Sequence, residues 1–554
     1  MATLFETHRA LLERAVAATA ERGYWTPYPE APSGRIYGET AKDDGEAAFE
    51  ARLGKPFALP GHPADEGTVG AERSPYGRAL DIAYPAASVD ALIAASRAAG
   101  AGWAAASVEQ RTGVCLEILA RLNRRSFEIG NAVMHTTGQA FVMAFQAGGP
   151  HAQDRALEAV AYAWAEMTRT PAAAEWSKPQ GKGEPLVLEK RYRIVPRGIA
   201  LTIGCATFPT WNGYPGMFAS LATGNTVIVK PHPAAILPLA ITVEIGREVL
   251  AEQGFDPDVL LLAADAPDAE KTKDLATRPE VGIVDFTGSN AFAGWLRDNV
   301  RGAQLYTEEA GVNSIVVAST GDFRGMCANI AFSLSLYSGQ MCTAPQDVWV
   351  PRGGIETDQG HKAFDEVAAG IAGAVDGLLS DPARAAGVCG ALAGEATLQR
   401  VRDSARLGRV VRPSTPIAGL EDARTATPLI LAVDAAETDA HLEERFGPIG
   451  FVVAADDAAD AIARAAAAAK AKGAITAAVY ATDDATLDAA ADAFAAAGVN
   501  LSCNLTGGIF VNQSAAFSDY HVTGGNPAGN ACLTDAAFVA NRFRVATVRR
   551  LKAG

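Results

Sequence analysis

The sequence predicts an α/β protein with two doubly wound, Rossmann-like domains. Short apolar runs rich in Val, Ile and Leu alternate with helical patterns from residue 192 onward. Two such series follow one another, with a boundary near residue 310. Continuous apolar strands separated by helices are typical of parallel sheets that are buried on both faces. The length of 554 residues accommodates two large domains of this class.

The part of the chain before the first series is predicted to be mostly helical. Thr3 and Glu6 form a capping box at the start of one helix, Ser88 caps a second, and Ser107 opens another capping box. Each motif places a side-chain acceptor against the free N–H groups of a helix start. Residues 1–75 turn rich in Pro and Gly after the first helix, and we expect an N-terminal extension there. The sequence assigns this extension no role.

Eight strands are expected in the two series, and a ninth near the C-terminus. Residues 543–550 alternate like an edge strand, and an edge strand at a terminus commonly pairs with another chain. We therefore expect a C-terminal oligomerisation arm and a homodimer or homotetramer. The strands of the two series are 198–204, 226–230, 259–263 and 282–286, followed by 314–318, 347–351, 449–453 and 477–480.

The composition argues against several classes of protein. A net charge of −15 disfavours nucleic acids and anionic membrane surfaces as partners, because both attract Lys and Arg. Residues 198–229 carry no charge, but Pro, Gly and Asn interrupt them, so no membrane span is predicted. The seven Cys form no CxxC pair, and the eight His form no HExxH motif. We therefore expect a cytoplasmic protein with neither a disulfide framework nor a metal site.

Two segments carry candidate reactive groups. Cys342 follows a Gly-Gln turn after an apolar run, where backbone N–H groups can stabilise a thiolate or an oxyanion. Glu308 and Glu309 precede the strand at 314–318, so either carboxylate can supply a general base. A buried structural Cys and a solvated Glu-Glu loop are the alternatives for these two segments.

Two further segments place polar groups where strands end. Lys230, followed by His232, lies at the carboxyl end of a predicted parallel strand, where open α/β sheets bind ligands. Gly288 and Ser289 follow another strand and open a helix, whose N-terminus suits the pyrophosphate of a nucleotide. The G-x-G-x-x-G fingerprint is absent, and an ordinary strand exit is the alternative for both segments.

Five short motifs together resemble the aldehyde dehydrogenase superfamily, in the order which that superfamily shows. The resemblance covers roughly residues 80–550. It implies a cofactor-binding domain at 76–309, a catalytic domain at 310–520 and an oligomerisation segment at 521–554. The motifs are Lys230-Pro231, Phe286-Thr-Gly-Ser289, Glu308-Glu-Ala-Gly-Val312, Gly339-Gln-Met-Cys342 and Glu444-Arg-Phe446-Gly-Pro448.

The resemblance also implies a mechanism. Cys342 attacks an aldehyde as a thiolate, hydride passes to a nicotinamide cofactor, and Glu308 activates the water that hydrolyses the thioester. The same resemblance assigns the cofactor to Lys230 and His232 beside the adenosine ribose or its phosphate, to Gly288 and Ser289, and to Glu444 and Phe446 beside the nicotinamide.

The chain departs from the family pattern at three places. The family's oxyanion Asn corresponds to Thr207, and Asn212 lies five residues further on, so either side chain can donate to an oxyanion. The Glu that often follows the strand-end Lys is Pro233 here. Removing a carboxylate lowers repulsion against a 2′-phosphate, which favours NADP over NAD. The Lys of the base motif is Val312, and nothing in the sequence says what this changes.

Within the superfamily, the chain looks most like the phenylacetate-degradation protein PaaN group. The extension, the Thr207-Phe-Pro-Thr-Trp segment and the divergent Glu308 motif carry this resemblance. It implies a ring-cleavage semialdehyde of phenylacetate or related aromatic catabolism as substrate, either free or linked to CoA.

Three alternative functions stay open at this point. A CoA-acylating dehydrogenase would pass the acyl group to CoA instead of water. A non-catalytic relative would act as a binding or assembly protein. A Cys hydrolase or acyltransferase would need a His base, for which the sequence shows no local signature.

Overall fold

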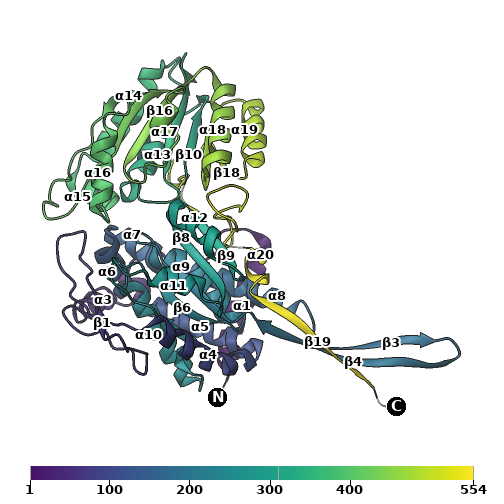
Figure 1. The fold of residues 1–554 in the computed structure, drawn as a ribbon. Helices are drawn as coiled ribbons and strands as arrows, with labels where there is room; N and C mark the ends of the chain where they lie inside the picture. Colours follow the sequence, from purple (N-terminus) through teal and green to yellow (C-terminus); the bar gives the residue numbers. More distant parts are fainter. Residues whose placement is uncertain (1, 310, 534, 553–554) are drawn as a thin grey trace.

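A computed structural model describes residues 2–309, 311–533 and 535–552 of the chain. Figure 1 shows two lobes, each with a sheet between helices, and an arm that projects from the first lobe. The two lobes confirm the predicted α/β class with two mainly parallel sheets. All eight expected strands of the two series are present, and their observed ends lie within two residues of the expected ones.

The first lobe holds a five-stranded parallel sheet in the order β7-β6-β5-β8-β9. β5 and β6 are buried along their whole lengths, because helices cover both faces of the sheet. The strands are β5 (Ile199–Ile203), β6 (Thr226–Lys230), β7 (Leu260–Leu262), β8 (Val281–Gly288) and β9 (Gln304–Glu309). The main helices are α4 (Val89–Ala105), α5 (Val108–Arg124), α6 (Ser126–Thr137), α8 (Ala152–Thr168), α9 (Pro209–Ala222), α10 (Leu237–Glu252) and α12 (Asn290–Asn299).

The second lobe holds a seven-stranded sheet in the order β14-β15-β16-β12-β10-β17-β18, in which β14 runs antiparallel to its neighbour. Its strands are β10 (Asn313–Val317), β12 (Pro345–Pro351), β14 (Arg409–Arg412), β15 (Leu429–Asp434), β16 (Ile449–Ala455), β17 (Thr476–Tyr480) and β18 (Asn500–Cys503). Its helices include α13 (Phe323–Ser335), α14 (Phe364–Leu378), α15 (Pro382–Cys389), α16 (Glu395–Ser404), α17 (Thr438–His441), α18 (Ala458–Lys472) and α19 (Asp484–Ala496).

The N-terminal extension is part of the first lobe's core. Helix α1 (Leu4–Glu21) begins at the expected Thr3 capping box and contacts α5 and α8. Its buried face consists of Leu12, Ala15 and Ala18, which join the same apolar cluster as α5 and α8. Two shorter helices follow, α2 (Gly34–Tyr37) and α3 (Ala41–Glu50). The extension therefore packs as a structural element of this lobe.

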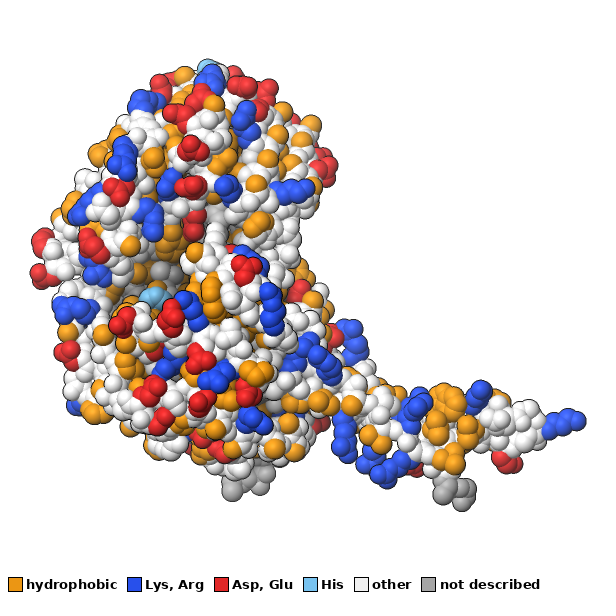
Figure 2. Space-filling model, viewed as in Figure 1, with side chains coloured by type: hydrophobic (Ala, Val, Ile, Leu, Met, Phe, Trp, Pro, Cys, Tyr) orange, Lys and Arg blue, Asp and Glu red, His pale blue; other side chains and the backbone are white. Residues whose placement is uncertain are grey.

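The arm is a three-stranded antiparallel sheet in the order β19-β4-β3. Its strands are β3 (Ala173–Gln180), β4 (Gly183–Pro196) and β19 (Phe543–Leu551), so the expected C-terminal edge strand is present. Figure 2 shows hydrophobic and basic side chains along the arm. The segment predicted as the C-terminal arm begins at residue 521, but the arm strand itself begins only at Phe543. Within the described residues, no helix has the length and hydropathy needed to cross a bilayer.

Candidate active site

Four polar side chains from distant parts of the sequence meet where the two lobes join; we call them the Cys342 cluster. The Cys342 Sγ lies 3.4 Å from Glu308 Oε1 and 3.9 Å from His521 Nε2. The Glu308 Oε1 lies 2.9 Å from His521 Nε2, and the Asn212 amide donates to Glu308 Oε2 at 2.9 Å. Glu308, Asn212 and His521 are buried, whereas Cys342 is partly exposed. A thiol, a carboxylate and an imidazole are therefore in mutual contact.

A strained turn places Cys342. Tyr337 and Ser338 have φ values of 51° and 49°, and Gly339 follows at 62°, a backbone region that favours glycine. A Cβ on Gly339 would lie 2.4 Å from the carbonyl oxygen of Gly447. The two motifs that end in Cys342 and Pro448 are thus in direct backbone contact, which requires a glycine at position 339; a Cβ on Gly447 would instead lie 2.8 Å from Thr397 Cγ2.

Hydrogen bonds fix the residues on both sides of the nucleophile candidate. The Gln340 amide donates to Ala391 O at 3.0 Å, and its oxygen accepts from Ala393 N at 2.8 Å. Asn313, at the start of β10, donates through Nδ2 to Cys342 O at 2.8 Å. The Cys342 loop is therefore held both by its own turn and by the neighbouring strand.

The adjacent carboxylates Glu308 and Glu309 point to different partners. Both lie at the end of β9 and both are buried, so the solvated-loop alternative is wrong. Glu308 faces Cys342, whereas Glu309 forms an ion pair with Arg297. β9 is the edge strand of its sheet, and residues 528–530 continue the pairing: Glu309 N donates to Ala528 O at 2.7 Å. This pairing keeps the end of β9 extended and separates the two side chains.

Burial and charge suppress ionisation of the Cys342 thiol in this arrangement. Burial raises the pKa of Cys342 well above its ordinary value, and the adjacent Glu308 carboxylate raises it further. The thiol is therefore protonated at rest, with a proton acceptor in contact. An attack by sulfur can be coupled to removal of its proton by Glu308.

The two oxyanion candidates occupy different surroundings. Asn212, in the first turn of α9, reaches the Cys342 cluster through its bond to Glu308. Thr207 precedes α9 and its carbonyl accepts from the Gln139 amide at 2.7 Å. Burial raises the pKa of the Cys205 thiol to about 11, and the Thr207 hydroxyl opposes this rise. Asn212 therefore hydrogen-bonds to Glu308 of the Cys342 cluster, whereas the Thr207 carbonyl bonds to Gln139.

The strand-end residues of the first lobe form a second polar region. Lys230, the last residue of β6, is buried, and its Nζ lies 2.6 Å from Asp265 Oδ1. Ser289 caps the ten-residue helix α12 by accepting from Phe292 N at 3.3 Å, and Gly288 ends β8. His232 is exposed beyond the end of β6. A buried cation at the end of β6 and a helix N-terminus after β8, on the two sides of β5, fit the ribose and pyrophosphate of a dinucleotide.

Glu444 and Phe446 lie on the loop between α17 and β16. The Phe446 carbonyl accepts from Arg400 Nη1 at 2.7 Å, and the next residue, Gly447, contacts the Gly339 turn. Burial raises the pKa of the Glu444 carboxyl to about 7, an effect that Arg400 opposes. This loop therefore contacts the Cys342 turn and carries a carboxyl group whose pKa is near neutral.

Three residues of these sites were not predicted from the sequence. His521 comes from the segment assigned to the arm, Asp265 follows β7 by three residues, and Asn313 begins β10 just after the Glu308 motif. The donor atoms of Glu308, Cys342 and His521 lie within 4.8 Å of one another, a grouping that was not part of the reasoning behind the expectation of no metal site. Close sequence spacing, the signal used for that expectation, cannot detect three ligands that are far apart in the chain.

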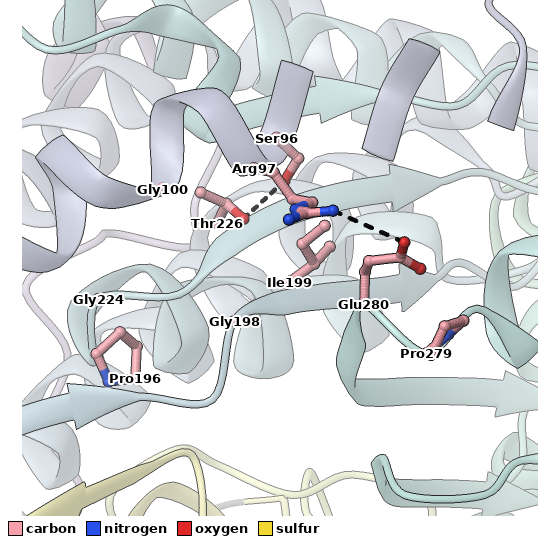
Figure 3. Close-up of a pocket in the computed structure, with 10 residues that line it drawn as sticks. All are labelled: Ser96, Arg97, Gly100, Pro196, Gly198, Ile199, Gly224, Thr226, Pro279 and Glu280. Atoms are coloured by element: carbon pink, nitrogen blue, oxygen red, sulfur yellow. Dashed lines mark hydrogen bonds and ion pairs between the residues drawn. The ribbon is translucent and has the colours of Figure 1, made fainter. Parts of the chain in front are cut away.

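A separate cavity of about 460 Å³ opens at the opposite edge of the first sheet. Figure 3 shows it beside the starts of β5 and β6, where Ser96 donates to Thr226 at 2.6 Å and Arg97 lies 3.9 Å from Glu280. Open α/β sheets bind ligands at the carboxyl ends of their strands, and these residues lie at the amino ends. The cavity therefore does not belong to the dinucleotide-type region at Lys230.

Comparisons with known proteins agree with this geometry. The model of the aldehyde dehydrogenase family matches residues 82–518. The crystal structure of an NAD-dependent aldehyde dehydrogenase from Burkholderia multivorans is 58% identical, with a TM-score of 0.98 over 100% of both chains. A 1-pyrroline-5-carboxylate dehydrogenase of Thermus thermophilus, 19% identical, shares the fold with a TM-score of 0.74 over 96% of this chain and 99% of that one.

Two N-succinylglutamate 5-semialdehyde dehydrogenases are more distant sequence relatives. The Chromobacterium violaceum enzyme is 29% identical over 49% of this chain, and the match spans only 53% of that enzyme. A Burkholderia cenocepacia enzyme is 28% identical over 70% of this chain and 77% of its own length. With a family model over most of its length and a full-length relative of known structure, the chain belongs to the aldehyde dehydrogenase family.

Proposed function

We propose that this aldehyde dehydrogenase oxidises an aldehyde to the carboxylic acid through a thioester on Cys342. The observation that carries the proposal is the 3.4 Å contact between Cys342 Sγ and Glu308 Oε1. It puts a nucleophile and a base at one point, held by separate lobes, at the end of a sheet that suits a nicotinamide dinucleotide. In this proposal residues 76–309 hold the cofactor and residues 310–520 carry the nucleophile.

Each proton has a place in this mechanism. As sulfur attacks the carbonyl carbon, Glu308 accepts the thiol proton and the carbonyl oxygen becomes an oxyanion, to which the Asn212 amide can donate. The bound cofactor supplies the hydride acceptor for the next step. The carbonyl then re-forms as a thioester. Once Glu308 has released its proton to solvent, it accepts one from water, and hydroxide adds to the thioester. Cleavage of the C–S bond then releases the acid and the Cys342 thiolate, which takes the proton back from Glu308.

For the cofactor we propose NAD. The sequence argument for NADP depends on the missing carboxylate at Pro233, but Asp265 places a carboxylate 2.6 Å from Lys230 Nζ. A carboxylate there repels a 2′-phosphate, and the 58% identical relative is described as NAD-dependent. Asp265→Asn should raise kcat/KM with NADP relative to NAD by about tenfold. If the ratio of kcat/KM with NADP to that with NAD is unchanged, Asp265 does not select against NADP, and the missing carboxylate at Pro233 again favours NADP.

For the substrate we propose a semialdehyde, first of all a ring-cleavage semialdehyde of phenylacetate catabolism, free or CoA-linked. The extension, the Thr207–Trp211 segment and the Glu308 motif support it. A succinylated amino-acid semialdehyde is the second candidate, favoured by the distant sequence relatives. Glu308 beside Cys342 supports hydrolysis over transfer to CoA, and the intact Cys342 cluster disfavours a purely non-catalytic role.

We also propose that the arm joins subunits into a homodimer or homotetramer. Residues 173–196 and 543–551 carry eight Lys and Arg against three Glu, in a chain whose net charge is −15. Apolar side chains on the arm are exposed as well, and they are Leu186, Val195, Val545, Val548 and Leu551. A basic, partly apolar arm suits an acidic second copy. Among the described residues no disulfide joins any of the seven Cys, which supports action in a reducing compartment such as the cytoplasm.

The experiment mixes protein, NAD or NADP and a panel of semialdehydes, and follows the absorbance of the reduced cofactor. The wild type should reduce NAD, and Cys342→Ala should lower the rate by about 10⁴-fold or more. Cys205→Ala is the matched control, since the Cys205 Sγ lies 3.6 Å from Asn212 Oδ1 but forms no hydrogen bond with Glu308. Full activity of Cys342→Ala would contradict the proposal.

A further inference from the structure

His521 is buried in contact with the proposed base, and the mechanism above does not use it. Its Nε2 lies 2.9 Å from Glu308 Oε1, and its side chain is 3% exposed. Its other ring nitrogen, Nδ1, has no hydrogen-bond partner among the described residues. The neutral imidazole therefore satisfies the carboxylate best with its N–H on Nε2. The Trp211 ring, 4.5 Å away and nearly perpendicular, fixes the plane of the imidazole.

A buried ion pair on α8 holds the segment that carries His521. Arg155 and Glu158 are both buried and in contact at 2.9 Å. Arg155 donates to Ser514 Oγ at 3.0 Å and to Asp519 O at 3.1 Å, and Glu158 accepts from Phe517 N at 3.0 Å. Three points along residues 514–519 are thus fixed just before His521. We call residues 514–521 the His521 segment.

The N-terminal extension holds the same segment from the other side. Arg22, the residue after α1, donates to Ser518 O at 3.0 Å and stacks on the Tyr520 ring at 4.1 Å. Its other amino group donates to Tyr162 at 3.1 Å. Trp25 packs against Phe517, with ring centroids 4.9 Å apart. The extension, which the sequence left without a role, therefore contacts the His521 segment at Phe517, Ser518 and Tyr520.

We propose that His521 is a positioning residue for Glu308, and that Arg22 and Trp25 of the N-terminal extension set its place. This inference deepens the proposed function and rests on Glu308 being the base. The hydrogen bond from His521 Nε2 to Glu308 Oε1 fixes the orientation of the carboxylate. His521 thus keeps the base aimed at the thioester carbon on Cys342.

The test needs neither aldehyde nor cofactor. Hydrolysis of p-nitrophenyl acetate acylates Cys342 in a burst and then depends on Glu308 for water attack, so the two steps are measured separately. His521→Ala should keep a burst of one acyl group per chain but slow the steady state by about tenfold or more. His521→Gln keeps an N–H donor and should recover most of the rate.

Arg22 supplies the second arm of the experiment. Arg22→Ala should slow the same steady state several-fold, and it should add little when combined with His521→Ala, because both act on one contact. Arg9→Ala is the control, since Arg9 lies on α1 and stacks on the Phe5 ring. Melting curves identify any variant that fails to fold; if His521→Ala unfolds, His521→Gln and Arg22→Ala carry the test.

Two results would overturn the inference. One is a folded His521→Ala enzyme with the wild-type steady-state rate. The other is a double variant whose loss of steady-state rate equals the product of the losses in Arg22→Ala and His521→Ala. The extension would then not act through His521. A wild type that hydrolyses the ester normally but oxidises no aldehyde would instead contradict the proposed function and leave the role of His521 intact.

Discussion

Two buried pairs of opposite ionisable groups, Lys230–Asp265 and His521–Glu308, have similar geometry and different origins. The first joins atoms at 2.6 Å and the second at 2.9 Å. Lys230 and Asp265 follow β6 and β7, which are neighbours in one sheet, so their meeting follows from strand order. Glu308 comes from a sheet edge, and His521 comes from a loop that the N-terminal extension holds. The end proposed for the nucleotide is thus built by one sheet, and the end proposed for the reaction by distant segments.

The largest expected effect separates the two neighbouring carboxylates. Glu308→Gln should lower aldehyde turnover by about 10²–10⁴-fold, as loss of a general base does. It should also speed alkylation of Cys342 by iodoacetamide at neutral pH, because it removes one of the causes that raise the pKa of the thiol. Glu309→Gln, which loses only a partner of Arg297, should change neither rate comparably. Equal losses of aldehyde turnover in both variants would show that Glu308 and Glu309 do not differ in role.

The next effect tests the pair built by one sheet. Lys230→Met should raise the KM for NAD by about ten- to a hundredfold with little change in kcat, since a charged hydrogen-bond donor is lost. The variant also leaves Asp265 buried without its cation, so Lys230→Met with Asp265→Asn should melt at a higher temperature than Lys230→Met alone. Lys273→Met removes an exposed lysine of the same lobe and serves as the control. A kcat effect as large as the KM effect would place Lys230 in the reaction instead.

A smaller effect concerns the turn that brings the second lobe to the site. Gly339→Ala forces a side chain against Gly447 O at a positive φ, and should lower the free energy of unfolding by about 1–3 kcal/mol. Gly294→Ala in α12 has open space and should stabilise by about 0.5–1 kcal/mol. Chemical denaturation measures both changes. A Gly339→Ala enzyme as stable as the wild type would show that the turn relaxes freely.

The smallest effect is a pH dependence. Burial raises the pKa of the Glu444 carboxyl to about 7, so it is largely protonated below that pH and ionised above it. If the ionised form orients the nicotinamide ribose, the KM for NAD should fall a few-fold from about pH 6 to about pH 8. Glu444→Gln should remove this trend. If the KM for NAD still falls with pH in Glu444→Gln, the titration of another group causes the fall.

The difference between the two ends of the site also explains what the sequence could predict. Lys230, Gly288 and Ser289 follow apolar strands, and the carboxyl ends of parallel strands share one edge, so local pattern sufficed to place them. Cys342 and Glu308 were paired only through an ordered set of motifs. His521 has no local signal: its position depends on Arg155, Glu158 and Arg22, which are hundreds of residues away in sequence. Cross-lobe contacts of this kind are tertiary and leave no spacing to detect.

The central claim is that a thioester on Cys342 is hydrolysed with Glu308 as base. The most direct measurement is peptide mass spectrometry of Glu308→Gln after mixing with NAD and a semialdehyde that the wild type oxidises. We predict an acyl group on the peptide that contains Cys342, at about one per chain, because hydrolysis is slowed while the hydride step still proceeds. No acyl group, or one on the peptide that contains Cys205, would contradict the account.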